Sequence, residues 1–238
     1  MGEELRNTLN EAEVPEEITG QPRRVLVGNV VLRRTFSALR HRNFQLFFFG
    51  QMVSLMGTWM QNTALSWLVY KMTGSKLLLG LVSASSSAPL LFFSVFGGSV
   101  ADRHPKRRVL LYTQTAMMFL AFALAVLSAT GHLTPGMIVL VSALGGVAMA
   151  FDMPTRQSFL VEITSREDLH NAISLNSAIV NSARVVGPAV AGLVMAKTSP
   201  SICFLLNGLS FFAVIGGLIA MKLAPHSQVH RPQPRPNP

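Results

Sequence analysis

The chain has 238 residues, of which half are hydrophobic and only 13% are charged. Soluble domains usually have about 25% charged residues, so the composition argues against a soluble domain. The charges are also clustered. Asp, Glu, Lys and Arg are absent from 43–70, 77–101, 109–151 and 198–221, and 169–196 contains one, Arg184. Long uncharged apolar stretches of this kind indicate a membrane protein.

The uncharged stretches predict six membrane-spanning helices, because about 20 apolar residues cross the hydrocarbon as a helix. The stretch 109–151 holds two of them, since residues 130–135 (TGHLTP) supply a turn in its middle. We place the spans at 44–70, 77–101, 109–130, 136–157, 169–196 and 202–221. We expect residues 1–43 to be a partly disordered cytoplasmic segment and the Pro-rich residues 222–238 to be a disordered tail.

The basic residues that give the net charge of +9 are sorted by loop. With six spans, alternate loops lie on opposite sides of the membrane. Lys and Arg number 16 on the side of the two termini and 3 on the other side. Because the Lys/Arg-rich side is cytoplasmic, both termini are predicted in the cytoplasm. We expect no nucleic-acid partner, because no soluble domain remains to present a basic patch.

Two of the predicted spans carry a polar stripe. In each, four polar residues separated by steps of 3, 4 and 3 follow one helix face: Gln51, Ser54, Thr58 and Gln61 in the first span, and Ser174, Ser177, Asn181 and Arg184 in the fifth. Lipid cannot satisfy such a face, so it must meet protein or water. The stripes either line an aqueous substrate path or hydrogen-bond to neighbouring helices, and the pattern leaves both interpretations open.

Other span residues predict how the helices pack. Ala183, Gly187 and Ala191 are spaced by four and would let another helix approach closely. The third span beyond Thr115 and most of the sixth span are nearly all apolar and are expected to be peripheral, with Cys203 as a small core residue. Ser165, with Asp168 three residues later, fits a capping box that would start the fifth helix at Ser165.

Arg184 is the costliest residue to insert, at about 2.5–3.5 kcal/mol for an arginine at a span centre. It could bind an anionic or hydrogen-bonding substrate group, pair with a carboxylate, or donate to backbone carbonyls of a neighbouring helix. Asp152 is the nearest candidate carboxylate in this half of the membrane. A rise of about 1.5 Å per residue places Arg184 on the order of 15 Å deeper than Asp152, so we do not expect the two to pair.

The loop after the second span combines one glycine, one carboxylate and several cations. Gly98 near the helix end would allow close helix contact. Asp102 lies at the inner membrane surface, with Arg103, Lys106 and Arg107 in reach of it and of lipid phosphates. An ordinary basic cytoplasmic loop is the alternative, although most such loops lack the Gly-x-x-x-Asp entry.

This loop, Gly98-x-x-x-Asp102-Arg103-x-x-Lys106-Arg107, resembles the inner-loop signature of the major facilitator superfamily. Asp152-x-Pro154-x-Arg156 and the Gly187-Pro188 element are similar to its drug and siderophore exporters, such as the enterobactin exporter and macrolide efflux proteins. The resemblance covers about residues 36–223. Pro105 stands where the family usually has glycine, and Ala183 and Ala191 replace usual glycines.

The resemblance implies an all-α membrane fold: six helices in a three-plus-three inverted repeat, forming half of a twelve-helix transporter. It implies that Asp102, Lys106 and Asp152 form a charge cluster at an inner gate. The other implied gate residues are Gly98, Arg103, Arg107, Arg156, Gly187 and Pro188. The implied substrate path contains Gln51, Ser54, Thr58, Gln61, Ser177, Asn181 and Arg184.

The implied function is secondary-active export of a small drug-like or siderophore-like molecule by alternating access, driven by a proton gradient and without a cofactor. No span centre holds a carboxylate, so the coupling acid would be Asp102, Asp152 or a group that this chain does not contain. We find no catalytic or metal-binding set and expect no enzyme. The expected partners are a small-molecule substrate, the lipid bilayer and a second six-helix half from the same or another chain. The alternative is a truncated, non-transporting remnant.

Overall fold

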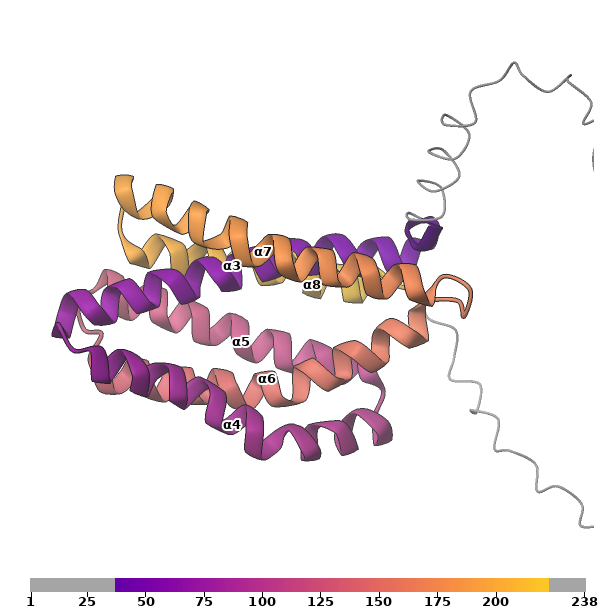
Figure 1. Cartoon of the computed structure of the whole chain (residues 1–238), viewed down its shortest axis with the longest axis horizontal. Helices are drawn as coiled ribbons and strands as arrows, with labels where there is room; N and C mark the ends of the chain where they lie inside the picture. Colours follow the sequence, from indigo (N-terminus) through magenta and orange to yellow (C-terminus); the bar gives the residue numbers. More distant parts are fainter. Residues whose placement is uncertain (1–36, 223–238) are drawn as a thin grey trace, which may run out of the picture. The chain divides into compact units, whose positions relative to one another are not determined.

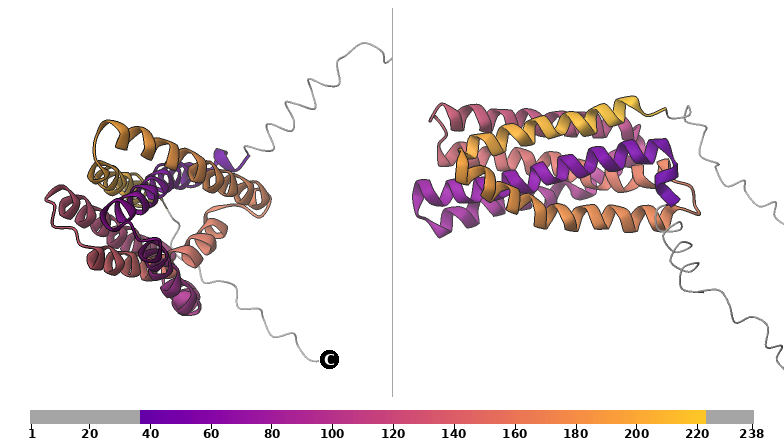
Figure 2. Two further views of the ribbon diagram at one scale, coloured as in Figure 1. Left: turned by 60° about the vertical axis from the view of Figure 1, so that its left-hand side comes forward. Right: turned by 90° about the horizontal axis from the view of Figure 1, so that it is seen from above.

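The structure, a computed structural model, describes residues 37–222, and the predictions made for 1–36 and 223–238 lie outside this range. Within it, a short 3-10 helix, η1 (Ser37–Arg40), precedes six long helices that run side by side (Figure 1; Figure 2). These are α3 (Arg42–Thr73), α4 (Lys76–Arg103), α5 (Lys106–Ala129), α6 (Pro135–Ile163), α7 (Leu169–Lys197) and α8 (Pro200–Ala220). Each overlaps one of the six predicted stretches.

Turn residues end the helices close to the predicted positions. Gly74 follows α3 with φ 62° and donates its N–H to Tyr70 O at 2.8 Å, a left-handed helix end that favours glycine. Gly131, with φ 73°, lies in the turn between α5 and α6, which confirms the predicted division of 109–151. Helix α6 runs on to Ile163, beyond its predicted end at 157, because Pro154 lies inside the helix without ending it.

The start of α7 corrects one prediction. The N-cap residue is Asp168, not Ser165, and the helix begins at Leu169. The paired contact of the predicted capping box does form, since Asp168 N donates to Ser165 Oγ at 3.2 Å and Ser165 Oγ donates to Asp168 Oδ2 at 3.2 Å. It closes a turn ahead of the helix instead of the first turn of the helix.

Helix α3 packs mainly on α7 and α8, α4 packs on α6, and α5 packs on α6 and α8. The aromatic face of α8 is buried in this arrangement, with Phe204 fully buried and Phe211 3% exposed, whereas Phe212 is 55% exposed. The predicted peripheral position is therefore wrong for one face of α8, and it is also wrong for α5, where Ala121 and Leu124 are buried. Apolar side chains pack equally well on lipid and on protein, so composition alone does not distinguish the two. Cys203 is a buried core residue, as predicted.

The small-residue stripe of α7 contacts α3, which confirms the predicted close approach of another helix and identifies that helix. Ala183 and Ala191 are fully buried, and a Cβ added at Gly187 would lie 2.5 Å from Trp59 Cβ and 3.0 Å from Met56 O. Small side chains at these positions therefore let the two helices approach closely.

A second close approach joins α4 to α6, and here the predicted glycine is off by one position. A Cβ at Gly97 would overlap the carbonyl oxygen of Ala150, whereas one at Gly98 would meet nothing within 4 Å. Because Pro154 has no N–H, Ala150 O lacks its usual helical hydrogen bond, and the Cα of Gly97 lies against this oxygen. The contact glycine is Gly97, not Gly98.

Five of the described helices, α4 to α8, are long and apolar enough to cross a membrane. Helix α3 has 32 residues, but its polar side chains lower its hydropathy, so the sixth span stays a prediction. Both ends of the described chain lie at the same end of the helices. Asn43 Nδ2 donates to Lys222 O at 2.9 Å, and Lys222 N donates to Asn43 Oδ1 at 3.3 Å.

At the same end, Asp168 connects the start of α7 to the start of the described chain. Its Oδ2 lies 2.9 Å from His41 Nε2, and the neighbouring Asn171 Nδ2 donates to Ser37 Oγ at 2.6 Å. Hydrogen bonds from Ser37, and next from His41, hold the pKa of Asp168 below its ordinary value of 3.8. The carboxylate form therefore favours the folded arrangement.

The first prediction concerns the two adjacent glycines of α4. Gly97→Ala should destabilise the protein by about 1–3 kcal/mol, because the new methyl group overlaps a backbone oxygen of α6. Gly98→Ala is the matched control, which should unfold at or above the wild-type temperature. Thermal unfolding of the purified protein in detergent measures both, and equal melting temperatures for the two variants would contradict the contact.

The second prediction concerns pH. Since the pKa of Asp168 is lowered in the folded state, its contribution to stability is complete above pH 3.8 and disappears as pH falls through the lowered value. Asp168→Asn should therefore melt below wild type at neutral pH, and the difference should vanish in strong acid. Glu167→Gln, at the exposed neighbouring residue, is the control. A difference that is the same at pH 7 and pH 3 would rule out this linkage.

Candidate functional site

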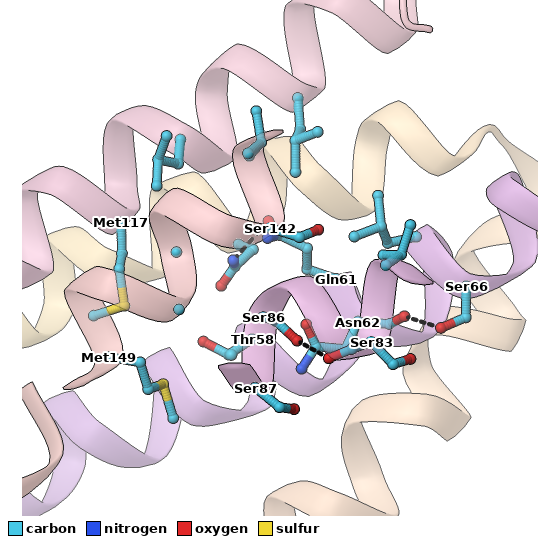
Figure 3. A pocket seen from close by; sticks show the side chains of 18 of the residues that line it. Thr58, Gln61, Asn62, Ser66, Ser83, Ser86, Ser87, Met117, Ser142 and Met149 are labelled. Carbon is cyan, nitrogen blue, oxygen red and sulfur yellow. Dashed lines mark hydrogen bonds between the residues drawn. The ribbon is translucent and has the colours of Figure 1, made fainter. Parts of the chain in front are cut away.

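A cavity of about 380 Å³ lies between α3, α4, α5, α6 and α8 (Figure 3). Small-molecule sites commonly measure about 300–1,000 Å³. Its polar lining comes mostly from α3 and α4: Thr58, Gln61, Asn62, Ser66, Ser83, Ser86, Ser87, Ser142 and Asn207. Its apolar lining includes Met117, Leu120, Leu124, Met149 and Phe211. No described residue that lines it is ionisable, so the cavity is polar on one side, apolar on the other and uncharged.

The predicted stripe of α3 divides into two parts. Thr58 and Gln61 line the cavity, and Thr58 Oγ1 donates to Ser54 O at 2.9 Å. Gln51 and Ser54 are buried in the bundle instead. The side-chain amide of Gln51 makes no hydrogen bond to any described residue. Only the second half of the stripe faces the cavity.

Helix α8 and helix α4 supply polar residues that the sequence analysis did not identify. Asn207, which is 1% exposed, donates from Nδ2 to Gln61 Oε1 at 2.8 Å. Asn207 could have been identified from the sequence, because it is the one side-chain amide in a mostly apolar predicted span. Ser86 and Ser87 lie three and four residues after Ser83, so the three serines share one face of α4, a periodicity related to the one that identified the stripe of α3.

The stripe of α7 lies elsewhere, because Ser177, Asn181 and Arg184 are exposed and do not line this cavity. Asn181 Nδ2 donates to Ser177 O at 2.9 Å. The Arg184 guanidinium carbon lies 5.2 Å from the centre of the Trp59 ring of α3, within the range of a cation–π contact. The partner of Arg184 is therefore an aromatic ring, and the prediction that it does not pair with Asp152 is confirmed.

Asp152 of α6 is completely buried and joins α6 to α5. It accepts hydrogen bonds from Thr113 Oγ1 at 2.8 Å and from Gln114 Nε2 at 2.7 Å. It also pairs with Arg156, one turn later on its own helix. A buried carboxylate needs such partners, because an unpaired charge is costly to desolvate.

The position of this carboxylate follows from helix geometry. Gln114 lies one turn before Met117 on α5, and Asp152 lies one turn after Met149 on α6. Both methionines line the cavity (Figure 3). The Asp152 cluster is therefore one helical turn beyond one end of the cavity.

The other predicted gate residues make different contacts from those expected. Lys106 Nζ lies 3.2 Å from Glu162 Oε2 of α6, and Arg107 Nη2 donates to Ile219 O of α8 at 2.8 Å. Asp102 and Arg103 are exposed and form no hydrogen bond or ion pair with another described residue.

The predicted cluster of Asp102, Lys106 and Asp152 is thus not formed in this conformation. Asp152 is already satisfied by Arg156 and by α5. Lys106 reaches Glu162 because α6 extends past its predicted end. Pro188 is half-buried inside α7, next to the contact glycine Gly187.

The known proteins that this chain resembles are membrane transporters. The profile of the transmembrane secretion effector family matches residues 33–233. The staphyloferrin A transporter of Staphylococcus aureus is 28% identical over 170 residues, 71% of this chain and 43% of that protein. The multidrug efflux pump Tap of Mycobacterium tuberculosis is 30% identical over 197 residues, 79% of this chain and 47% of that protein.

The macrolide efflux protein A of Streptococcus pyogenes is 22% identical over 185 residues, 76% of this chain and 44% of that protein. The chain spans less than half the length of each of these three relatives. The family match covers most of the chain, and it agrees with the apolar helices and with the inner-loop signature. The chain is therefore a multi-pass membrane protein that belongs to the transmembrane secretion effector family of the major facilitator superfamily, similar to drug and siderophore exporters.

Proposed function

We propose that this chain is one six-helix half of a secondary-active exporter of small molecules, and that the cavity between α3, α4, α5, α6 and α8 is part of its substrate path. The observation that carries the proposal is the cavity itself. It is large enough for a small molecule and uncharged. Polar side chains line it, although the helices that surround it are otherwise mostly apolar. The relatives named as transporters and efflux pumps support the same reaction class.

The packing of the helices supports a three-plus-three repeat. In such a repeat, α3, α4 and α5 correspond to α6, α7 and α8, respectively. The contact between α4 and α6 then corresponds to the contact between α7 and α3, and the contact between α3 and α8 corresponds to that between α6 and α5. The contact between α5 and α8 corresponds to itself. The main packing pairs are therefore preserved by this correspondence, as an inverted repeat requires.

Exposed side chains on α4 support the proposal of a second half. Leu91, Phe92 and Val95 are each about three-quarters exposed on the described bundle. We propose that a second six-helix half, from the same or another chain, covers part of α4 and α7, with lipid on the rest. The bundle would lie in a bacterial inner membrane with both termini in the cytoplasm, which the 16-to-3 distribution of Lys and Arg supports.

A proton gradient is the proposed energy source, and Asp152 is the proposed coupling acid. Asp102 is exposed at a helix end, whereas Asp152 is buried one turn beyond the cavity. Protonation of Asp152 would neutralise the partner of Arg156 and alter the hydrogen bonds to Thr113 and Gln114. These contacts join α5 to α6, so proton binding would change how the two helices are held together.

The third prediction tests the substrate path by filling the cavity. Gly145 lines the cavity, and a Cβ there meets nothing within 4 Å, so Gly145→Phe adds bulk without a backbone clash. Gly216→Phe is the matched control on the exposed face of α8, where a Cβ also meets nothing within 4 Å. A panel of amphipathic compounds is tested for accumulation in cells, with and without an uncoupler.

Uncoupler-sensitive export should disappear in Gly145→Phe and persist in Gly216→Phe, at equal amounts of protein in the membrane. Full export by Gly145→Phe would remove the cavity from the substrate path. An absence of energised export in every form, including the wild-type chain with its second half, would favour a non-transporting remnant.

The fourth prediction compares the two candidate acids. Asp152→Asn keeps the size of the side chain but removes its proton site, so it should lower uncoupler-sensitive export by roughly tenfold. Substrate binding should be retained. Asp102→Asn should have a smaller effect on coupling. The reverse order of the two variants would transfer the role to Asp102.

A further inference from the structure

We infer that the cavity binds an uncharged amphipathic molecule that carries hydroxyl groups, with a glycoside or polyol as the closest chemical class. This inference rests on the proposed function, because it names the ligand of the same cavity. The inference follows from the charge and the hydrogen-bonding groups of the side chains that line each wall of the cavity.

First, the described residues that line the cavity carry no charge. Among the described residues that line the cavity, none is Asp, Glu, Lys, Arg or His. The nearby Asp152 is neutralised by Arg156, and Arg184 lies over Trp59 outside the lining. A charged ligand group in this space would lose water without gaining an opposite charge, which is unfavourable. The part of the ligand that enters is therefore neutral.

The second step concerns the hydroxyl wall. Ser83 Oγ donates to Leu79 O at 3.1 Å, and Ser86 Oγ donates to Ser83 O at 2.9 Å. On the facing helix, Thr58 Oγ1 donates to Ser54 O at 2.9 Å. Each hydroxyl proton is thus used within its own helix, and each oxygen keeps lone pairs for a ligand. These three oxygens are acceptors, so the ligand supplies O–H or N–H donors to them, whereas the hydroxyls of Ser87 and Ser142 donate to no described residue and can either donate to or accept from the ligand.

The third step concerns Gln61, whose amide is oriented by α8. Asn207 Nδ2 donates to Gln61 Oε1 at 2.8 Å. Asn207 Oδ1 lies close to the Cα of Gly57, since a Cβ added at Gly57 would be 2.7 Å from this oxygen. A Cα–H group can donate a weak hydrogen bond to an oxygen but not to an NH₂ group, which supports this orientation of the Asn207 amide. The Gln61 NH₂ group is therefore left to donate to the ligand, and Asn207 acts as its positioning residue.

The fourth step concerns the opposite wall. Met117, Leu120, Leu124 and Phe211 present only apolar atoms to the cavity from their side chains, apart from weakly polar sulfur. This wall suits an aliphatic or aromatic body. The ligand therefore carries hydrogen-bond donors on one edge, an acceptor that faces the Gln61 NH₂ group, and an apolar body. An uncharged amphiphile that carries hydroxyl groups has all three features.

Three photoreactive probes test the inference. Each carries the same diazirine-bearing octyl chain, and they differ only in the head group, which is an uncharged glucoside, a trimethylammonium or a carboxylate. The full chain is reconstituted in nanodiscs of phosphatidylethanolamine and phosphatidylglycerol. Labelled residues are identified by mass spectrometry, and yields are divided by the yield at the exposed Phe212 to correct for partition into lipid.

The glucoside should label cavity-lining residues at least about threefold more than either charged probe, a ratio equivalent to about 0.65 kcal/mol. Gln61→Leu should reduce that ratio. Equal or stronger labelling by a charged probe, or no labelling of the cavity by any probe, would overturn the inference.

A second variant keeps the test independent of folding defects at Gln61. Ser87 lines the cavity, is exposed and forms no hydrogen bond with another described residue, so Ser87→Asp places a carboxylate at the edge of the cavity. The preference should then change from the glucoside to the trimethylammonium probe. Ser99→Asp, on the exposed end of α4 outside the lining, should leave the preference unchanged. An unchanged preference in Ser87→Asp would also overturn the inference.

These results are separate from those on transport. Glucoside selectivity without energised export would contradict only the proposed function. Energised export together with a preference for a charged probe would contradict only the ligand class.

Discussion

Hydrocarbon offers no hydrogen bond, so each polar side chain within the membrane needs a partner in the protein or in water. Two sets of buried partners meet this requirement between helices. Asp152 joins α6 to α5, and Asn207 joins α8 to α3 through Gln61. These contacts tie together helices that are otherwise apolar and have no strong reason to prefer each other over lipid. The polar groups that face the cavity, namely the serine hydroxyl groups of α4 and the NH₂ group of Gln61, have no such partner on another described helix.

The glycine contacts complement this polar network. Gly97 brings α4 close to the carbonyl oxygen of α6 that Pro154 leaves without its helical partner, and Gly187 brings α7 close to α3. Close backbone contact at a few points is compatible with open space elsewhere along the same helices. Helix α4 therefore packs tightly on α6 through Gly97 and Gly146, while its serines still face the cavity. Close contacts beside an open path suit the proposed half-transporter, which would move as one body.

Much of the fold could be predicted from the sequence, because charge-free length and turn residues determine where membrane helices begin and end. The site was predictable only in part. The stripes of α3 and α7 have the same 3-4-3 spacing, yet Gln61 faces the cavity and Asn181 is exposed. Periodicity gives the face of a helix but not its neighbour. The same limit explains the shift from Gly98 to Gly97, and the pairing of Lys106 with Glu162, whose helix extends past the predicted end.

The central claim is that the hydroxyl face of α4 meets water in the membrane interior and not fatty chains. Single cysteines at Ser86 and at Phe212, in a Cys203→Ala background, measure this directly. A membrane-impermeant trimethylammonium methanethiosulfonate should modify the cysteine at position 86 and leave the one at position 212 unmodified, because only the first lies in the cavity. Modification of position 86 no faster than position 212 would contradict the account.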